Sequence, residues 1–477
     1  MSDDQVVQET RVTGLLEITE KGQGFLRIES RKFKPVPADP TVSAEVIARD
    51  HLRPGLMLTA TVKSSGRSPA PAVMDIVSVN GKTLEEYWQM PAFGDLTVID
   101  PRERLKLETT GGPISMRIMD LLTPIGRGQR GLIVAPPKTG KTTLLKQIAE
   151  ATLINHPDMK VFILLVDERP EEVTDFRRTL NAEVWASNND EDVLSHVRTA
   201  RTVIERARRM VEFGHHVMVV LDSLTRLGRA FNHFVGSSGR TMTGGVDSGA
   251  LVEPRAIFGS ARNIENGGSL TIIASCLIET GSKMDDLIFQ EFKGTGNMEL
   301  VLSRKLAERR VWPAIDLPAS GTRKEELLLG ATHAYKSGML RRDLIGRDPV
   351  AAMDVLVKAL SRYQTNAQFW DSLASPTKLP APAAAARPAP VASNGSPAAS
   401  SLVGMPAAKP AVPVPQAPVI PEDSNSPTVG VARPMRTGHG SRRYSSRGRS
   451  QRGSRSGRGG GGGGGGGGHG GGGRRRR

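Results

Sequence analysis

Apolar residues follow two different patterns along the chain. Between residues 11 and 82, short runs rich in β-branched residues are separated by turn residues, and they cover 14–18, 24–28, 56–62 and 73–79. Short strands at this spacing predict a small β-barrel. We therefore expect a first domain over residues 11–82, after a flexible N-terminus over residues 1–10.

From Ile114 the pattern changes to continuous apolar runs separated by helical segments. The runs are 131–134, 161–166, 217–221 and 270–274, and the clearest helical periodicity lies at 191–212. Continuous apolarity is typical of strands that are covered on both faces. The chain is therefore predicted to have an α/β domain with a mostly parallel sheet over residues 113–375, joined to the barrel by a connector at 83–112 with a short amphipathic segment at 84–88.

The first strand of this domain leads into Gly131-Leu-Ile-Val-Ala-Pro-Pro-Lys-Thr-Gly-Lys-Thr-Thr143, which matches a phosphate-binding loop except that Ala135 replaces the first glycine. Backbone N–H groups around Gly140 and the following helix N-terminus suit a polyphosphate, Lys141 suits the outer phosphates and Thr142 suits Mg²⁺. A plain strand–turn–helix with a capping threonine is the alternative. The expected ATP-binding residues here are Ala135, Pro136, Pro137, Lys138, Thr139, Gly140, Lys141, Thr142 and Thr143.

Carboxylates follow two further strands. Glu168 lies in the segment 167–172 that directly follows the run at 161–166, and Asp222 directly follows the run at 217–221. Ligands of parallel sheets bind at the carboxyl ends of the strands, so we expect Glu168 to act as general base and Asp222 to hold Mg²⁺ through water. The alternatives are a helix start at Pro170 and a solvated helix cap at Asp222.

One segment of the barrel suits a nucleic acid, and two segments of the α/β domain are rich in loop-forming residues. In the barrel, Phe25 and Arg27 follow a tight turn and could stack a base and hold a phosphate, although Phe25 could equally be barrel core. In the α/β domain, the Gly-, Ser- and Thr-rich segment 236–247 and the turn 280–283 are expected to be mobile loops near the nucleotide, or else ordinary surface loops.

The charge of the chain is unevenly distributed. Residues 376–477 hold 16 Lys and Arg against 2 Asp and Glu, a net charge of +14, and the body retains +1. Composition predicts a disordered tail, rich in Pro and Ala and then in Arg and Gly, that favours a polyanionic partner. The single cysteine, Cys276, excludes an intramolecular disulfide, and the absence of a signal peptide or an apolar span predicts a cytoplasmic protein that does not bind membranes.

Read together, several motifs resemble the Rho family of bacterial transcription termination factors. They are the phosphate loop and residues 115–130 before it, 167–174, 221–226, 243–247, 294–300 and 320–326. This family also has Ala in place of the first loop glycine. The resemblance implies a homohexameric ring with a RecA-like, ATP- and Mg²⁺-dependent motor and an OB-type RNA site, which translocates along nascent single-stranded RNA and acts on RNA polymerase.

The resemblance also implies individual roles. Lys138, Lys141 and Thr142 would bind phosphate and Mg²⁺, Glu168 would be the catalytic base, Arg323 the arginine finger of a neighbouring subunit, Arg169 and Arg310 its interface partners, and Trp312 the adenine stack. Two central loops would grip RNA, and Lys293 would lie near its path. The implied RNA-binding residues are Phe25, Arg27, Gly239, Arg240, Thr241, Thr243, Gly244, Gly245, Lys283 and Lys293.

Some features depart from the family pattern. The barrel has Gln23 where a second aromatic is common and lacks the aromatic expected near 71–73, which predicts a weak or altered RNA site that the arginine-rich tail supplements. Two alternatives stay open: a subunit of a rotary, ATP-synthase-type enzyme, and a binding protein that anchors RNA and uses ATP only as a conformational ligand.

Overall fold

The structure, a computed structural model, describes residues 10–64, 69–236, 241–242 and 244–373. The chain divides into one unit over residues 1–387 and a second over 388–477, and all the described residues belong to the first unit. The expectations for residues 1–9 and for the tail from Pro376 lie outside the described residues.

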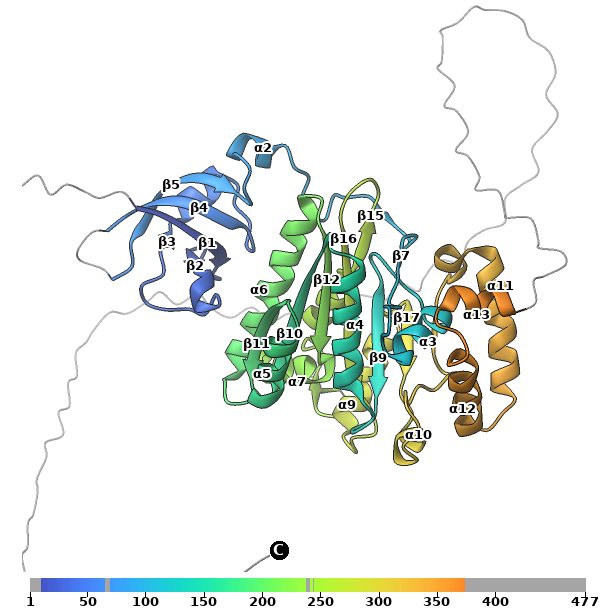
Figure 1. Cartoon of the computed structure of the whole chain (residues 1–477). Helices are drawn as coiled ribbons and strands as arrows, with labels where there is room; N and C mark the ends of the chain where they lie inside the picture. The colour runs from blue at the N-terminus through green and yellow to red at the C-terminus, as the bar shows by residue number, and fades with distance from the viewer. Residues whose placement is uncertain (1–9, 65–68, 237–240, 243, 374–477) are drawn as a thin grey trace, which may run out of the picture. The chain divides into compact units, whose positions relative to one another are not determined.

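The N-terminal part is a closed five-stranded barrel with strand order β1-β2-β3-β5-β4 (Figure 1). Its interior holds fully buried Leu26, Leu58 and Val79. The four expected strands are present, whereas the two-residue strand β3 and helix α1 were not predicted. The barrel elements are β1 Thr10–Ile18, β2 Gly24–Arg27, the 3-10 turn Glu29–Arg31, β3 Thr41–Val42, α1 Ala44–Arg49, β4 Met57–Lys63 and β5 Ala72–Val79.

The segment after the barrel is more than a connector. Helix α2 (Leu84–Trp88) begins at a capping box in which Thr83 and Glu86 bond to each other's backbone N–H groups. Strand β6 (Val98–Ile99) then pairs with β15, and β7 (Arg104–Leu105) pairs with β8 (Ile125–Gly126). Two-residue strands carry no periodic signal, which explains why they were not predicted.

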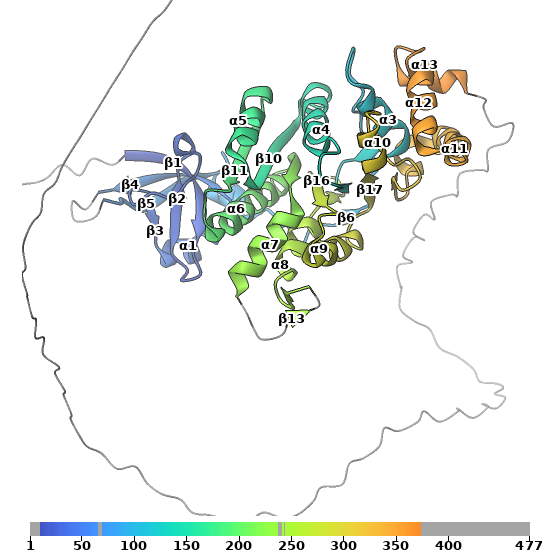
Figure 2. The ribbon, with the colours of Figure 1, turned by 90° about the horizontal axis from the view of Figure 1, so that it is seen from below.

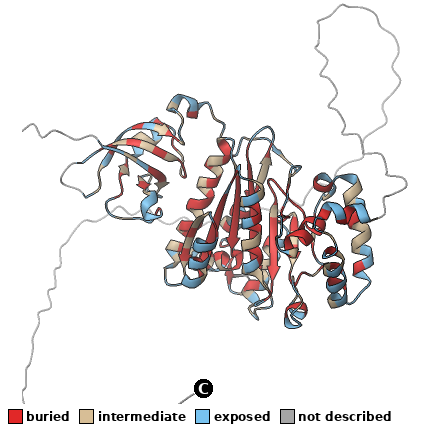
Figure 3. Cartoon of the chain, viewed as in Figure 1, coloured by how far each residue is buried: buried red, intermediate tan, exposed pale blue. Residues whose placement is uncertain are grey.

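The larger part is built on a nine-stranded sheet whose main path runs β11-β10-β12-β16-β9-β17-β18. The five strands from β11 to β9 and strand β17 pair in parallel, and β18 is antiparallel. Figure 3 shows the central strands buried over most of their length, as their continuous apolar runs predict. The strands are β9 Arg130–Ala135, β10 Met159–Glu168, β11 Glu183–Asn188, β12 His216–Asp222, β15 Arg262–Ile264, β16 Ser269–Leu277, β17 Met298–Val301 and β18 Gly321–Thr322.

Helices cover both faces of this sheet (Figure 2). Helices α4 and α5 share one hydrophobic core with α3 and α12, and α6, α7, α8 and α9 share a second core on the other face. The expected α/β class with an N-terminal barrel is thereby confirmed. The helices are α3 Ile114–Leu122, α4 Lys141–Asn155, α5 Pro170–Thr179, α6 Val193–Glu212, α7 Leu224–Val235, α8 Val252–Gly259, α9 Lys283–Lys293, α10 Arg304–Glu308, α11 Glu326–Ile345, α12 Pro349–Leu360 and α13 Asn366–Ser372.

The barrel packs against helix α6. Gly55 has a φ of 86°, and a Cβ at this position would lie 2.4 Å from the backbone carbonyl carbon of Glu205, so only glycine permits this approach. Arg198 of α6 donates two hydrogen bonds, of 2.6 and 2.7 Å, to the carboxylate of Glu17 in the barrel. Cys276 is fully buried in the second core. None of the described helices combines the length and apolarity that a membrane span requires.

Candidate active site and nucleic-acid interface

The phosphate loop lies between β9 and α4. Ala135 is the last residue of β9 and is fully buried, so its methyl group belongs to the core and no glycine is needed there. Thr139 Oγ1 donates to Pro136 O at 2.7 Å and closes the turn. Gly140, with φ 87°, precedes α4 without a side-chain cap, which leaves the first N–H groups of a fifteen-residue helix available to an anion.

The loop brings Lys141 to two carboxylates at neighbouring strand ends. Its Nζ contacts Oδ1 of Asp222 and lies 3.7 Å from Oε1 of Glu168. Asp222, the last residue of β12, is 1% exposed and accepts a 2.8 Å hydrogen bond from Ser275 on the same oxygen. The sequence prediction that Lys141, Glu168 and Asp222 belong together is thus met by the geometry, although their chemical roles stay predictions.

The other oxygen of Asp222 favours a cation. Oδ2 is buried and has no hydrogen-bond partner among the described residues, which is costly for a carboxylate unless a further ligand is present. Thr142 Oγ1 is 3.4 Å from Glu172 Oε2. The described part of the chain holds no group of three or more His, Cys, Asp or Glu side chains placed for a metal. Thr142 and Asp222 therefore fit Mg²⁺ that is shared with a polyphosphate, and not a metal held by protein alone.

Glu168 is placed to act as a base. It ends β10 and is only 3% exposed. Burial and the nearby Asp222 carboxylate raise the pKa of Glu168 to about 7, while the charges of Lys141 and Arg226 lower it. A carboxylate whose pKa lies near neutrality is suited to taking a proton from water.

Arg226 was not assigned a role from the sequence. It lies in the first turn of α7, after the Ser223 cap, and its guanidinium also donates to Asp167 at the end of β10. The sequence did contain a signal for Arg226, because it lies three residues after Ser223, the helix cap that directly follows β12. Ser275 was missed as well, because it lies within an apolar strand.

A pocket of about 380 Å³ flanks the loop. Trp312 is 44% exposed, and a Cβ at Gly140 would lie 3.0 Å from its ring. Ser115 and Gln147, which were not predicted, line the same pocket and are joined by a 2.6 Å hydrogen bond. An exposed indole beside a phosphate loop suits a purine better than a packing role does, since tryptophan is usually largely buried.

Comparisons with known proteins agree with both halves of the architecture. Residues 12–85 match the family model "Rho termination factor, RNA-binding domain", and residues 115–322 match "ATP synthase alpha/beta family, nucleotide-binding domain". The transcription termination factor Rho of Streptomyces coelicolor is 48% identical over 365 residues, which cover 76% of this chain and 86% of that protein. The chain belongs to the Rho family of transcription termination factors.

A second Rho, from Cereibacter sphaeroides, is 47% identical over 364 residues and is covered to 86%. A solved ATPase from a type III secretion system of pathogenic bacteria is 25% identical, with a TM-score of 0.45 over 53% of this chain and 70% of that one. The two Rho relatives confirm the family expected from the motifs. The chain combines an RNA-binding domain with an ATP-hydrolysing domain, as in Rho.

The structure does not bring every expected residue of the Rho active site together within one chain. Arg323 follows β18, and its N–H donates to Asn297 O at 2.9 Å, while Asn297 N–H donates to Arg130 O at 3.0 Å. Arg323 therefore lies beside the first residue of β9, whereas the phosphate loop follows the last residue of the same strand. The six residues of β9 separate the two by roughly 20 Å. Arg169 and Arg310 are exposed, at the start of α5 and after α10.

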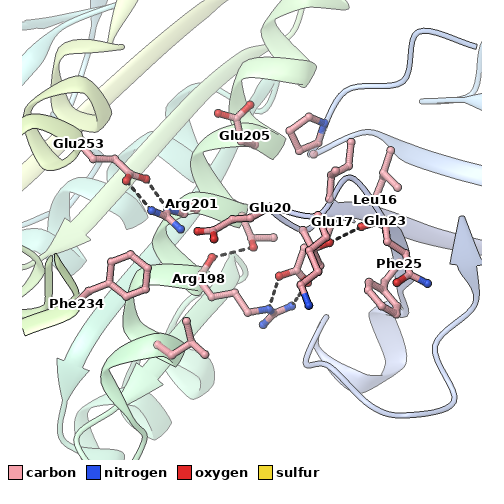
Figure 4. A pocket seen from close by; sticks show the side chains of 17 residues that line it. Leu16, Glu17, Glu20, Gln23, Phe25, Arg198, Arg201, Glu205, Phe234 and Glu253 are labelled. Atoms are coloured by element: carbon pink, nitrogen blue, oxygen red, sulfur yellow. Dashed lines mark hydrogen bonds and ion pairs between the residues drawn. The ribbon is translucent and has the colours of Figure 1, made fainter. Parts of the chain in front are cut away.

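The barrel presents the expected aromatic. Phe25 is half-buried and lines a cavity of about 760 Å³ between the barrel and the α6–α8 region, together with Gln23 (Figure 4). Arg27 differs from the expectation of a free cation. It lies 4.7 Å over the Phe25 ring but is 7% exposed and bonded to Glu17 and Asp39, at 2.5 and 2.8 Å. An RNA phosphate would have to compete with two carboxylates for it.

The two loops that were expected to grip RNA, at 239–247 and 280–283, contact each other. Strands β13 (Thr241–Met242) and β14 (Val246–Asp247) form a hairpin, and a Cβ at Gly244 would lie 3.1 Å from the carbonyl oxygen of Lys283, the exposed first residue of α9. Gly245 completes the turn with φ 79°. Gly239, Arg240 and Thr243 lie outside the described residues.

Lys293 does not join this pair of loops. It is the last residue of the eleven-residue helix α9, so it lies at the other end from Lys283. There it lines a cleft with Arg323. Its contact with RNA stays a prediction.

Proposed function

We propose that this Rho-family chain is an RNA-stimulated ATPase that assembles into a hexameric ring, translocates along nascent RNA and releases it from RNA polymerase in the cytoplasm. The observation that carries the proposal is the separation of Arg323 from the phosphate loop. A guanidinium beside the opposite end of β9 from the phosphate loop cannot reach the γ-phosphate of its own chain, so it can complete only a neighbour's site.

In each proposed site, the uncapped N-terminus of α4, Lys138 and Lys141 bind the phosphates of ATP. Phosphate oxygens compete with Asp222 and Glu168 for Lys141, which leaves Glu168 free to orient water and accept its proton. Mg²⁺ held through Thr142 and Asp222 would neutralise phosphate charge. The neighbour's Arg323 stabilises the charge of the transition state, and Arg169 and Arg310 support the same interface.

RNA is proposed to bind at two places. The barrel holds a base on Phe25. The hairpin at 241–247 and the N-terminus of α9 with Lys283 contact the strand in the ring channel, and their mutual contact lets them move as one unit when ATP is hydrolysed.

The test is the ATPase rate of the full chain with and without RNA, together with its mass in solution. We expect hydrolysis to require RNA and the ATPase-active species to have the mass of six chains. ATP hydrolysis that is insensitive to RNA would favour the rotary-type alternative, although the match of residues 12–85 to an RNA-binding domain argues against it.

The second alternative is an RNA-anchoring protein for which ATP is only a conformational ligand. Glu168→Gln distinguishes it from a motor. Loss of RNA release from polymerase with ATP binding retained would support the motor, and unaffected release would support the anchoring protein.

A further inference from the structure

A small cleft separates the barrel from the α/β domain next to the Phe25 cavity. Its volume is about 150 Å³. The barrel contributes the loop 32–35, and the other wall is formed by α5, β11 and α6. The cleft shares Arg198 and Thr202 with the larger cavity that Phe25 lines, so the two adjoin each other at these residues.

The cleft is strongly cationic. Its charged lining residues are Lys32, Lys34, Arg177 and Arg198 against the single carboxylate Glu191. Lys34 forms an ion pair with Glu191 at 2.8 Å, and Arg198 forms an ion pair with Glu17 of the barrel. Lys32 and Arg177 are exposed, and neither side chain has an ion pair or hydrogen bond within the described residues. Two uncompensated cations across a narrow gap attract an anion.

A buried donor in the same cleft lacks an acceptor. Trp185 of β11 is 6% exposed, and its indole Nε1–H has no hydrogen-bond partner in the described part of the chain. Buried indole N–H groups normally find a partner, and an unmet one is destabilising. Trp185 lines the cleft, so a ligand bound there lies beside a residue whose donor is unmet.

The barrel loop is held in an unfavourable conformation to form this wall. Lys32 and Phe33 are consecutive non-glycine residues with φ of 54° and 56°. Left-handed conformations are unfavourable for such residues and occur preferentially at ligand-binding sites. The result is that Phe33 stacks on Trp185, with ring centroids 4.7 Å apart and planes 9° from parallel, and Lys32 and Lys34 flank the cleft.

The size of the cleft limits the ligand. At about 150 Å³ it is smaller than the roughly 300–1,000 Å³ of small-molecule sites. A phosphate group fits, whereas a nucleoside does not. We propose that the cleft binds a backbone phosphate of the RNA strand whose base lies at Phe25. This proposal rests on the RNA-binding function of the chain.

The test compares neighbouring arginines of α5. Arg177 lines the cleft, whereas Arg178 is exposed and does not. With a twelve-nucleotide RNA and the full chain, we expect Arg177→Ala and Lys32→Ala each to weaken binding roughly threefold to tenfold and to reduce the slope of log K against log salt by about 0.7. Arg178→Ala should change neither, and all variants should retain the wild-type affinity for ATP.

Two further measurements separate the cleft from general surface charge. Trp185→Phe keeps an aromatic ring on Phe33 but removes the N–H and part of a buried ring, so it should lower the unfolding midpoint and weaken RNA binding without changing the salt slope. Inorganic pyrophosphate should compete with RNA in the wild type and compete less in Arg177→Ala.

The outcomes that would overturn the proposal are distinct. Equal losses in Arg177→Ala and Arg178→Ala would indicate general surface charge, and no loss in Arg177→Ala and Lys32→Ala would exclude the cleft from the RNA path. Pyrophosphate binding that depends on Arg177 but leaves RNA affinity unchanged would assign the cleft to a free anion. A wild-type chain that binds no RNA would refute the RNA-binding function itself.

Discussion

The Nε atom of Arg226 lies 3.2 Å from Oε1 of Glu168. This cation lowers the pKa of Glu168, against burial and the Asp222 carboxylate, which raise it. We therefore expect Arg226→Ala to move the acidic limb of kcat/KM for ATP to higher pH, whereas Arg226→Lys should preserve most of it. The measurement is the pH profile of RNA-stimulated hydrolysis. A limb that stays in place in Arg226→Ala would contradict the assignment of Glu168 as the titrating group.

The pKa of about 7 for Glu168 predicts how the activity of the wild type depends on pH. A general base must be ionised, so kcat/KM should fall as the pH drops below about 7. Glu168→Gln should lose roughly 10²- to 10⁴-fold in kcat with ATP binding retained.

The same shift affects stability. The pKa of Glu168 is raised from 4.5, so the folded state holds its proton more tightly than the unfolded state, and this contribution to stability is lost as the pH rises from about 4.5 to about 7. Thermal unfolding should show Glu168→Gln more stable than wild type at pH 8 and equal to it near pH 4. If Glu168→Gln were less stable than wild type at pH 8, the charges of Lys141 and Arg226 would outweigh the cost of burying the ionised carboxylate.

Arg323→Ala should reduce kcat by roughly 10³-fold or more, as expected for an arginine finger. Mixing tests whether it acts on a neighbour. Lys141→Ala and Arg323→Ala chains are each inactive, but about a quarter of the interfaces in a randomly mixed ring combine an intact loop with an intact finger. ATPase activity should therefore reappear on mixing. Lys324→Ala, which removes an exposed cation paired with Asp100, is the control and should leave the rate unchanged. A mixture without activity would place the finger within one chain.

Trp312→Ala should raise the Kd for ATP roughly threefold to tenfold, because an aromatic stack is worth about 0.5–1.5 kcal/mol beyond its buried area, and Trp312→Phe should restore most of the affinity. Equilibrium titration with ATP measures both. Trp88→Ala is a matched control, since that indole is also half-exposed but lies on α2. Loss of thermal stability in Trp312→Ala at constant ATP affinity would show that this tryptophan is a packing residue instead.

Deleting residues 376–477 should weaken RNA binding and flatten its salt dependence, because the tail carries a net charge of +14. The tail itself offers the control. Residues 441–477 hold 11 arginines, so their deletion should reproduce most of the effect, whereas deletion of 376–440 should not. Unchanged affinity and slope in the full deletion would make the tail irrelevant to RNA.

Site residues could be predicted from the sequence where a polar residue follows a continuous apolar run. Glu168 and Asp222 could be placed because both lie where a continuous apolar strand ends, and parallel strands bring their carboxyl ends together. Strand β11 was missed because its sequence holds only three consecutive apolar residues, and β3 and β6 because two residues carry no period. Partners distant in sequence were also hidden. Nothing local to Arg27 indicates that Glu17 and Asp39 neutralise it.

The single thiol of the chain offers a route to measuring the assembly directly. Cys276 is fully buried, and burial raises its pKa to about 12, so it is almost entirely protonated at neutral pH and a poor nucleophile. A cysteine introduced at an exposed position would then be the only reactive one in each chain. Spectroscopic labels attached there would report distances between subunits in the unmodified background, without first replacing the native residue.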